Sequence, residues 1–223
     1  GYTATRLAPP LAPEEGGPGP VELPAGTFVA PPPFASLATG LVSTLPDQLA
    51  FLRSLVGEIS EAASLGVMDG ADVLYVERVR AGLTRLGVDI RIGTLIPASV
   101  GIIGHAMLAF LPQRDRDRVL ATPPRRGETA PQALTRPELE RTLEAIRQRG
   151  YALHDSLFGN GLRVLAVPVL DMDGYPVASI SVAAPIVRMP MDEFLSRALS
   201  ALQQAAREIA RAVQASGTIS TAI

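Results

Sequence analysis

The sequence predicts an α+β domain built on a mainly antiparallel sheet of about six strands with helices on its faces. Two amphipathic helical stretches, residues 45–59 and 191–215, stand at the two ends of the folded region. Between them, apolar segments are paired by short Asp/Gly turns rather than by the regular crossover helices of a parallel sheet. The length of 223 residues with 47% hydrophobic residues is enough for a core without a metal or disulfide.

Residues 1–44 differ in composition from the rest of the chain. They include Pro31-Pro32-Pro33 and the run Gly16-Gly17-Pro18-Gly19-Pro20, and they show no lasting helical or strand-like period. We expect residues 1–44 to be a Pro/Gly-rich linker or arm, followed by one folded domain over residues 45–223.

The first half of this domain begins with a helix over residues 45–59, where apolar residues recur at helical spacing after Thr44 as a candidate cap. Strands are expected at residues 64–69 and 72–79, because Asp69-Gly70 between them tolerates the positive φ of a hairpin turn. A third strand is expected within residues 86–92.

The apolar stretch 98–111 predicts a buried helix that Pro112 closes. The run from Leu95 to Leu111 is too short, and too rich in Gly, Pro and His, to cross a membrane. The small residues Gly101 and Gly104 allow backbone or ligand to approach closely.

The second half begins with a helix over residues 136–149, which has Thr135 and Glu138 in capping-box spacing and Gly150 at its end. Three strands are predicted next, at residues 151–154, 162–170 and 176–183. We expect the final helix, 191–215, to pack beside the first.

Composition excludes several kinds of chemistry. All 20 basic residues are Arg, and Cys is absent, so Schiff-base, thiol and Cys-ligated zinc chemistry are ruled out. Two histidines are too few for a multi-histidine metal site, and the net charge of −2 disfavours generic nucleic-acid binding. We expect no metal and no cofactor. No secretory signal opens the chain, so the cytoplasm is the expected location.

Three short motifs have an ordinary structural interpretation. His154-Asp155-Ser156 contains triad residue types, but neighbouring residues on a strand point to opposite faces. Asp171, Asp173 and Gly174 indicate a hairpin turn rather than a calcium loop, because the distal glutamate is missing. Glu58 and Glu61 indicate a solvated helix face rather than an acid/base pair.

Arg163 is the most suggestive polar residue, because it enters an apolar strand and must face water, pair with an acid or bind an anionic ligand. His154 precedes it across a short turn, so the two could bind a carboxylate or hydroxyl together. His105, within the apolar helix, is by default a core histidine.

Five sequence segments, in the same order along the chain, resemble the effector-binding domain of IclR-type transcription regulators. These segments run from Asp72 to Val79, Gly93 to Pro112, Arg149 to Ala152, Gly161 to Val169 and Val177 to Val182. The residues from Gly161 to Val169 are most similar to those of the branch that regulates protocatechuate and hydroxybenzoate catabolism. The resemblance covers about residues 45–215.

The resemblance implies a GAF-like domain that forms dimers or tetramers and binds a small organic acid between its sheet and the glycine-containing helix. Matched position by position, the family's pocket segments fall on Ile96, Ser99, Val100, Gly101, Ile102, Ile103, His154, Asp155, Leu162, Arg163 and Val164. His105 stands where relatives usually have a basic residue. Ile102 and Ile103 are bulkier than in relatives that bind two- or three-carbon acids, which favours an aromatic or longer acid.

The family also carries an N-terminal winged helix-turn-helix, and no such motif precedes Leu45. We therefore expect an excised or naturally reduced effector domain, which reaches operator DNA only through a winged helix-turn-helix domain absent from this chain.

The expected function is that of a ligand sensor and not of an enzyme: effector binding shifts how subunits pair, without membrane contact. The backbone amides near Ser99 to Gly101 are expected as anion donors. Arg163→Ala is expected to lose effector affinity and to retain the fold. Two alternatives stay open: a small hydrolase or isomerase with His154 as base, and a GAF-like interaction module without a ligand.

Overall fold

The computed structural model describes residues 45–80, 90–125, 134–155 and 161–215. The predicted linker, 1–44, lies outside these ranges, so the division of the chain at residue 44 stays a prediction.

The domain is built on one six-stranded sheet in the order β3-β2-β1-β6-β5-β4, in which every neighbouring pair is antiparallel. The strands are β1 (Ala62–Asp69), β2 (Asp72–Val79), β3 (Leu95–Pro97), β4 (Ala152–Asp155), β5 (Leu162–Leu170) and β6 (Pro176–Pro185). The predicted α+β class with an antiparallel sheet is confirmed.

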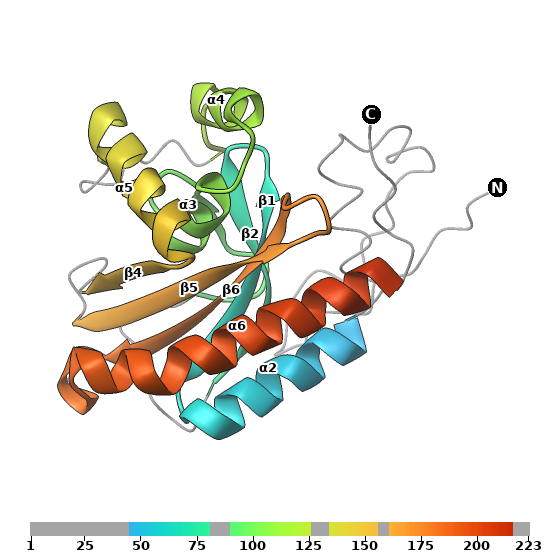
Figure 1. The fold of residues 1–223 in the computed structure, drawn as a ribbon, viewed down its shortest axis with the longest axis vertical. Helices are drawn as coiled ribbons and strands as arrows, with labels where there is room; N and C mark the ends of the chain where they lie inside the picture. The colour runs from blue at the N-terminus through green and yellow to red at the C-terminus, as the bar shows by residue number, and fades with distance from the viewer. Residues whose placement is uncertain (1–44, 81–89, 126–133, 156–160, 216–223) are drawn as a thin grey trace, which may run out of the picture. The chain divides into compact units, whose positions relative to one another are not determined.

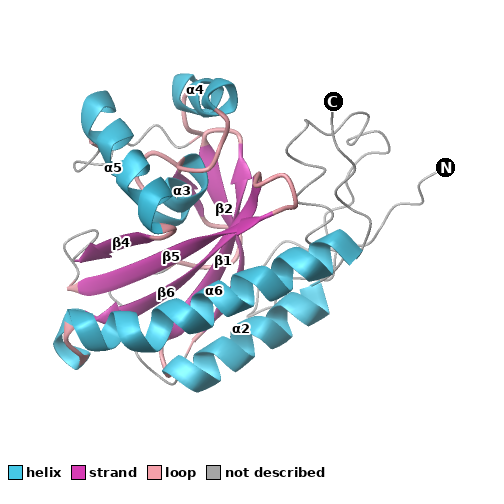
Figure 2. Cartoon of the chain, viewed as in Figure 1, coloured by secondary structure: helices cyan, strands magenta, loops and turns pink. Residues whose placement is uncertain are grey.

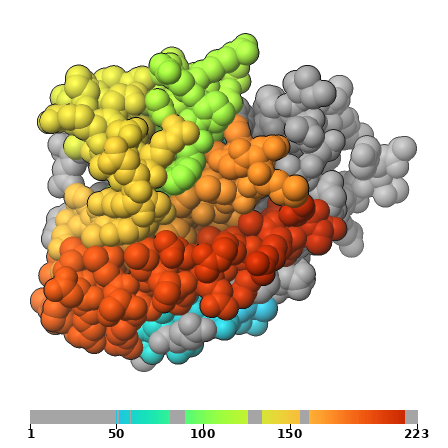
Figure 3. All heavy atoms as spheres, in the orientation of Figure 1, coloured from blue at the N-terminus to red at the C-terminus, as the bar shows by residue number. Residues whose placement is uncertain are grey.

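Helices cover both faces of the sheet (Figures 1 and 2). On one face lie α2 (Leu45–Ile59) and α6 (Met191–Ala215), which pack side by side as expected from their matching periodicity. The other face carries α3 (Ile102–Leu108). The helices α4 (Gln113–Ala121) and α5 (Arg136–Arg149) extend this layer, and a 3-10 turn, η2 (Ile186–Arg188), leads from β6 into α6. In Figure 3 the outer face of α6 is uncovered along its length.

The two faces of the sheet carry side chains of different size. Under α2 and α6 the strands present large apolar residues, which form one core with Phe194 and Leu202. Those strand residues are Leu65, Val67, Leu165, Val167, Ile180 and Val182. Alternation places several small or hydroxyl residues on the α3 face, namely Ser64, Gly66, Ala152, Ala166, Ser179, Ser181 and Ala183. The larger Met68, Val73, Tyr75 and Val164 also lie on this face.

The predicted turns and caps are present. Gly70 and Gly174 adopt φ of 66° and 77° in the two hairpin turns. Asp171 Oδ1 accepts hydrogen bonds from the amides of Asp173 and Tyr175, so this carboxylate closes a turn rather than forming a calcium site. The Thr135–Glu138 capping box is formed at the start of α5.

Three expectations need correction, and one helix was not expected. Residues 86–89 lie outside the described ranges and residues 90–92 form no strand; the third strand is instead β3. The helix expected over 98–111 is shortened to α3, because Pro97 O accepts bonds from the amides of Val100 and Gly101 in a preceding turn. The helix α4 was not predicted, since Val119 is its only buried residue and apolar periodicity is almost absent. Glu61 lies beyond α2 and is buried against Arg188, at 2.8 Å, rather than on a solvated face.

The described helices include none that is long and apolar enough to cross a membrane.

Candidate functional site

The helix α3 lies close against the sheet and against its own preceding turn. A Cβ on Gly104 would stand 2.3 Å from the carbonyl oxygen of Ala98, and a Cβ on Gly66 of β1 would stand 3.0 Å from Ile103 Cγ2. The Gly104 clash is with backbone atoms, so only glycine permits that approach, whereas a Cβ on Gly66 would first meet the side chain of Val73, at 2.7 Å. Gly104 therefore fixes α3 close to its preceding turn, and Gly66 leaves room on β1 for Ile103.

A polar row crosses the sheet on the α3 face. Strand pairing aligns Arg78, Ser64, Ser181, Ala166 and Ala152 from β2 to β4. Arg78 Nη1 donates a hydrogen bond of 2.9 Å to Ser64 Oγ, and both serines are buried. The row thus places a guanidinium and two hydroxyl groups on the same face of the sheet as α3.

A second row runs parallel to it through Tyr75, Gly66 and Ser179. Ser179 Oγ donates to Val167 O at 2.9 Å. Burial raises the pKa of Tyr75 to about 12, against a smaller opposing effect of the Arg78 charge. The phenol is therefore neutral at physiological pH.

Both histidines belong to this side of the sheet. His105 Nε2 lies 2.8 Å from Ser99 O; a carbonyl only accepts, so the imidazole donates and ties α3 to its preceding turn. His154 pairs with Val164, which packs with the α3 core. Burial lowers the pKa of each histidine; the hydrogen bond to Ser99 opposes this for His105, and the Asp155 charge opposes it for His154, in each case to a smaller extent. Both imidazoles are consequently neutral at pH 7 and able to donate or accept hydrogen bonds.

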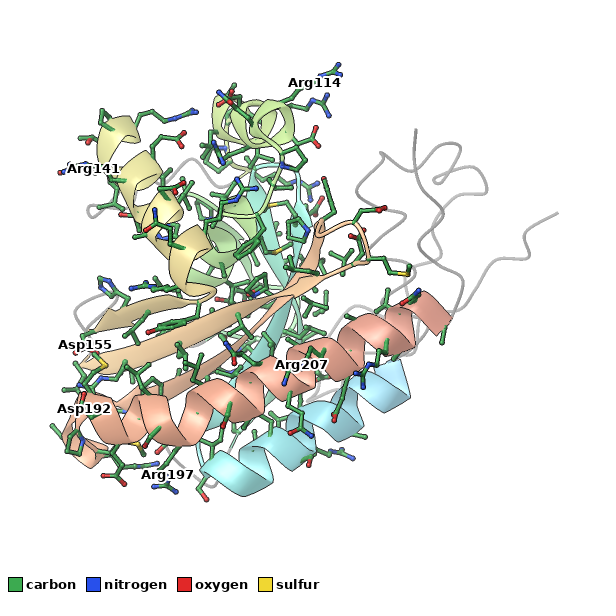
Figure 4. The ribbon with its side chains drawn as sticks, in the orientation of Figure 1. Arg114, Arg141, Asp155, Asp192, Arg197 and Arg207 are labelled. Carbon is green, nitrogen blue, oxygen red and sulfur yellow. The ribbon has the colours of Figure 1, made fainter. Side chains whose placement is uncertain are left out.

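Arg163 and Asp155 lie on the opposite, α6 face. Arg163 Nε and Nη2 donate to the two carboxylate oxygens of Asp155 at 2.6 and 3.2 Å, and Nη1 donates to Met189 O at 2.8 Å. The guanidinium carbon stands 5.9 Å from the centre of the Phe194 ring. Figure 4 shows Asp155 at the end of the sheet near the start of α6, where Asp192 is labelled. Of the outcomes open to Arg163, the structure shows pairing with an acid.

The residues expected to form the site therefore separate into groups. Ile96, Ile102, Ile103 and Val164 share the core around α3. Ser99, Val100 and Gly101 form the turn before this helix, where the amides of Val100 and Gly101 already donate to Pro97 O. His154 lies on the same face. Leu162 packs apart with Ala62, and Arg163 with Asp155 occupies the α6 side.

Sequence reasoning did not single out Arg78, Ser64, Ser179 or Ser181. One signal was available, since Ser179 and Ser181 alternate with apolar residues in the otherwise apolar strand β6. Serines at every second strand position share a face. Their partner Ser64 gives no comparable signal.

The chemistry of this face is that of recognition rather than catalysis. It offers hydroxyl, imidazole and guanidinium groups beside apolar walls, which suit a small ligand with a charged or hydroxylated end. Within the described ranges, no group of three His, Asp or Glu side chains could hold a metal ion. Fold and site together define an α+β domain whose α3 face has the side chains that recognition of a small ligand requires.

The family follows from comparison with known proteins. The family model for the bacterial transcriptional regulator IclR C-terminal domain matches residues 47–211. The chain therefore belongs to the IclR family and contains its effector-binding domain. The Pca regulon regulatory protein of Pseudomonas putida is 26% identical over 187 residues, which cover 82% of this chain and 64% of that protein.

Solved structures show the same fold. The IclR protein of Thermotoga maritima matches with a TM-score of 0.66 and 25% identity, over 82% of this chain and 75% of that one. The inducer-binding domain of a double mutant of PobR from Acinetobacter, in complex with 3-hydroxybenzoic acid, matches with a TM-score of 0.60 and 23% identity, over 72% of this chain and 94% of that one.

The matched relatives are transcriptional regulators and not enzymes. The chain spans 56–64% of the length of the curated relatives it first matches.

Proposed function

We propose that this domain senses a small organic acid, specifically an aromatic one, bound between α3 and the sheet. The observation that carries the proposal is the contrast between the two faces of the sheet. The α6 face fills its core mainly with Leu, Val and Ile. The α3 face presents Ala, Gly and Ser beneath apolar Ile102 and Ile103, alongside the larger Met68, Val73, Tyr75 and Val164.

Large apolar residues on the α3 face would give a more stable core, because burying hydroxyl groups gains less than burying hydrocarbon. Small side chains with hydroxyl groups leave room and hydrogen-bonding partners for a ligand. The bulk of Ile102 and Ile103 supports an aromatic ring over a two-carbon acid. The PobR domain bound to 3-hydroxybenzoic acid, whose fold matches this one, adds support.

In the full regulator, the domain would act as a dimer or tetramer in the cytoplasm and reach operator DNA through a separate winged helix-turn-helix domain. Effector binding would favour one arrangement of the subunits over another, since only differential affinity can shift such an equilibrium. The residues proposed to contact the effector are those of the α3 face: Ile96, Ile102, Ile103, His154, Val164 and Ser181.

The test is thermal unfolding of the 223-residue chain with millimolar protocatechuate, 4-hydroxybenzoate, β-ketoadipate, pyruvate or glyoxylate. A ligand at 100 times its Kd stabilises by about 2.7 kcal/mol, or roughly 5–11 °C for a domain of this size. One acid should raise the Tm selectively, and Ser181→Ala should reduce that rise, whereas Ser196→Ala on the exposed face of α6 should not. No shift with any acid would contradict the proposal and favour the ligand-free module.

A further inference from the structure

We propose that helix α4 is a strap that opens locally, and that its opening admits the effector to the core around α3. The strap consists of α4 and the residues that follow it to Arg125, whose ion pair with Asp69 is its latch. Admission of an effector rests on the proposed function, whereas the local opening does not depend on it.

The first argument is that the proposed site is closed. Ile103 and Ser181 are 1% and 5% exposed, and Ile102 is 5% exposed. A ligand reaches side chains this deeply buried only when an element that covers them moves. The element that moves first is the one that the fewest interactions hold in place.

Helix α4 has the smallest apolar anchor among the helices around this core. All residues of α3 are buried, and α5 buries Leu139, Leu143 and Ile146. Val119 is the one buried residue of α4, and it belongs to the same core as Ile103. Segments with few buried apolar contacts open at a cost well below that of global unfolding.

Ionic contacts hold the strap instead. Arg125 Nη1 and Nη2 donate to the two carboxylate oxygens of Asp69 at 2.7 and 2.8 Å, at the turn between β1 and β2. On the side of α5, Arg136 pairs with Asp117. The Arg125 side chain is 58% exposed, and exposed ion pairs contribute little and are screened by salt. The latch therefore favours the closed position without making it permanent.

The buried carboxylate of Asp72 reduces the cost of opening. Asp72 is 1% exposed, and its Oδ2 accepts a hydrogen bond of 2.8 Å from the amide of Arg125. Within the described ranges, Asp72 Oδ1 has no hydrogen-bond partner. A buried carboxylate oxygen without a partner is unfavourable, and water can reach it once Arg125 has moved away. Hydration of Asp72 thus offsets part of the bonds lost on opening.

The opposite end of the segment stays in place. The amide of Ala98 donates to Ala71 O at 2.9 Å, in the same turn that binds Arg125, and Gly104 packs against the Ala98 backbone. Helix α3 therefore remains on the sheet while α4 moves, and Pro112 at the start of α4 marks the boundary.

The opening is measured by hydrogen exchange with mass spectrometry. The proteins are the wild-type chain, Arg125→Gln, Asp69→Asn, the double variant and the control Arg114→Gln. Arg114 is exposed on α4 and points away from the domain in Figure 4, so its replacement makes the same charge change on the same helix without touching the latch. Thermal unfolding checks that each variant folds.

In the wild type, amides of α4 should exchange at least about tenfold faster than those of β5. Arg125→Gln and Asp69→Asn should each accelerate α4 by a further two- to fivefold, roughly the value of an exposed ion pair, and the double variant should exceed neither. About 1 M NaCl should accelerate the wild type more than Arg125→Gln. Exchange of α4 as slow as that of β5, or equal acceleration by Arg114→Gln, would overturn the strap.

Admission of the effector is measured by ligand line-shape NMR with 4-hydroxybenzoate, or with pyruvate if a short acid stabilises the chain instead. Arg125→Gln should raise the association rate constant by about two- to fivefold, in step with the faster exchange of α4, and Arg114→Gln should not.

Failure of the two proposals can be told apart. A wild-type chain that binds none of the acids overturns the proposed function and, with it, the admission of an effector. A chain that binds an acid, with an unchanged association rate in Arg125→Gln despite faster exchange of α4, overturns only the admission.

Discussion

Replacing Arg163 by Met should destabilise the domain and leave effector affinity unchanged. The sequence alone led to the opposite expectation, lost affinity with a retained fold. The reversal follows from the position of Arg163 on the α6 face, where its side chain is 7% exposed and joins β4 and β5 to the segment just before α6.

The magnitude follows from the hydrogen bonds that the substitution removes. These are a bidentate charged pair and one bond to the carbonyl of buried Met189, while methionine keeps most of the apolar stem. Hydrogen bonds of charged groups contribute about 1.5–3 kcal/mol each, but Asp155 is 40% exposed and can be rehydrated, which reduces the effect. We expect a decrease of about 2–3 kcal/mol in the free energy of unfolding, or roughly 4–12 °C in Tm.

The assay is urea unfolding followed by circular dichroism, on wild type, Arg163→Met, Asp155→Asn and the double variant. The double-mutant cycle isolates the coupling between the two side chains, which should be at least about 1 kcal/mol. Ligand-induced shifts in Tm are measured on the same proteins. A decrease in stability below about 0.5 kcal/mol together with an abolished ligand shift would refute the reasoning and return Arg163 to the binding site.

Three further predictions concern backbone and protonation. Gly104→Ala should lower the free energy of unfolding by about 1–3 kcal/mol, because the new Cβ would meet the Ala98 backbone. Gly57→Ala in α2, where a Cβ would have nothing within 4 Å, should raise it by about 0.5–1 kcal/mol. Urea unfolding of both variants tests this, and equal effects would contradict it. Ser60 adopts a φ of 59° after α2, so Ser60→Gly should raise the free energy of unfolding by about 0.5–1 kcal/mol in the same assay. A decrease would show that the Ser60 side chain contributes more to stability than the relief of its backbone conformation. Burial lowers the pKa of His105 in the folded state, so the unfolded chain takes up the proton first as the pH falls. The free energy of unfolding should therefore be full above about pH 6.5 and decrease below it. His105→Gln should flatten this dependence between about pH 7.5 and 5.5, and an unchanged slope would be the contrary result.

Much of the fold was predictable because it depends on local patterns. Helical spacing located α2 and α6, the capping box and Gly150 bounded α5, and Asp/Gly turns joined the two hairpins. These signals reside within a few neighbouring residues. The helix α4 was not predicted from the sequence, because it buries only Val119 and forms charged pairs instead, such as Arg116 with Glu140 of α5. The two members of such a pair lie far apart in the sequence, so no local pattern indicates the helix.

The candidate site was only partly predictable. The apolar walls around α3 and His154 were foreseen by family resemblance, and the structure places them on one side of the sheet. The polar row of Arg78, Ser64 and Ser181 was not foreseen, because its members come from three strands and become neighbours only through strand register.

By itself the sequence determined the α+β class, the antiparallel hairpins and the absence of thiol and lysine chemistry, since composition and short-range periodicity are sufficient for these. Only the tertiary structure decided which face of the sheet each polar residue occupies. A strand exposes alternate residues to opposite sides, and the packing of α3 against one side and α6 against the other assigns each side its environment. That assignment places Arg163, paired with Asp155, on the α6 side of the sheet, and the buried Ser64 and Ser181 on the α3 side.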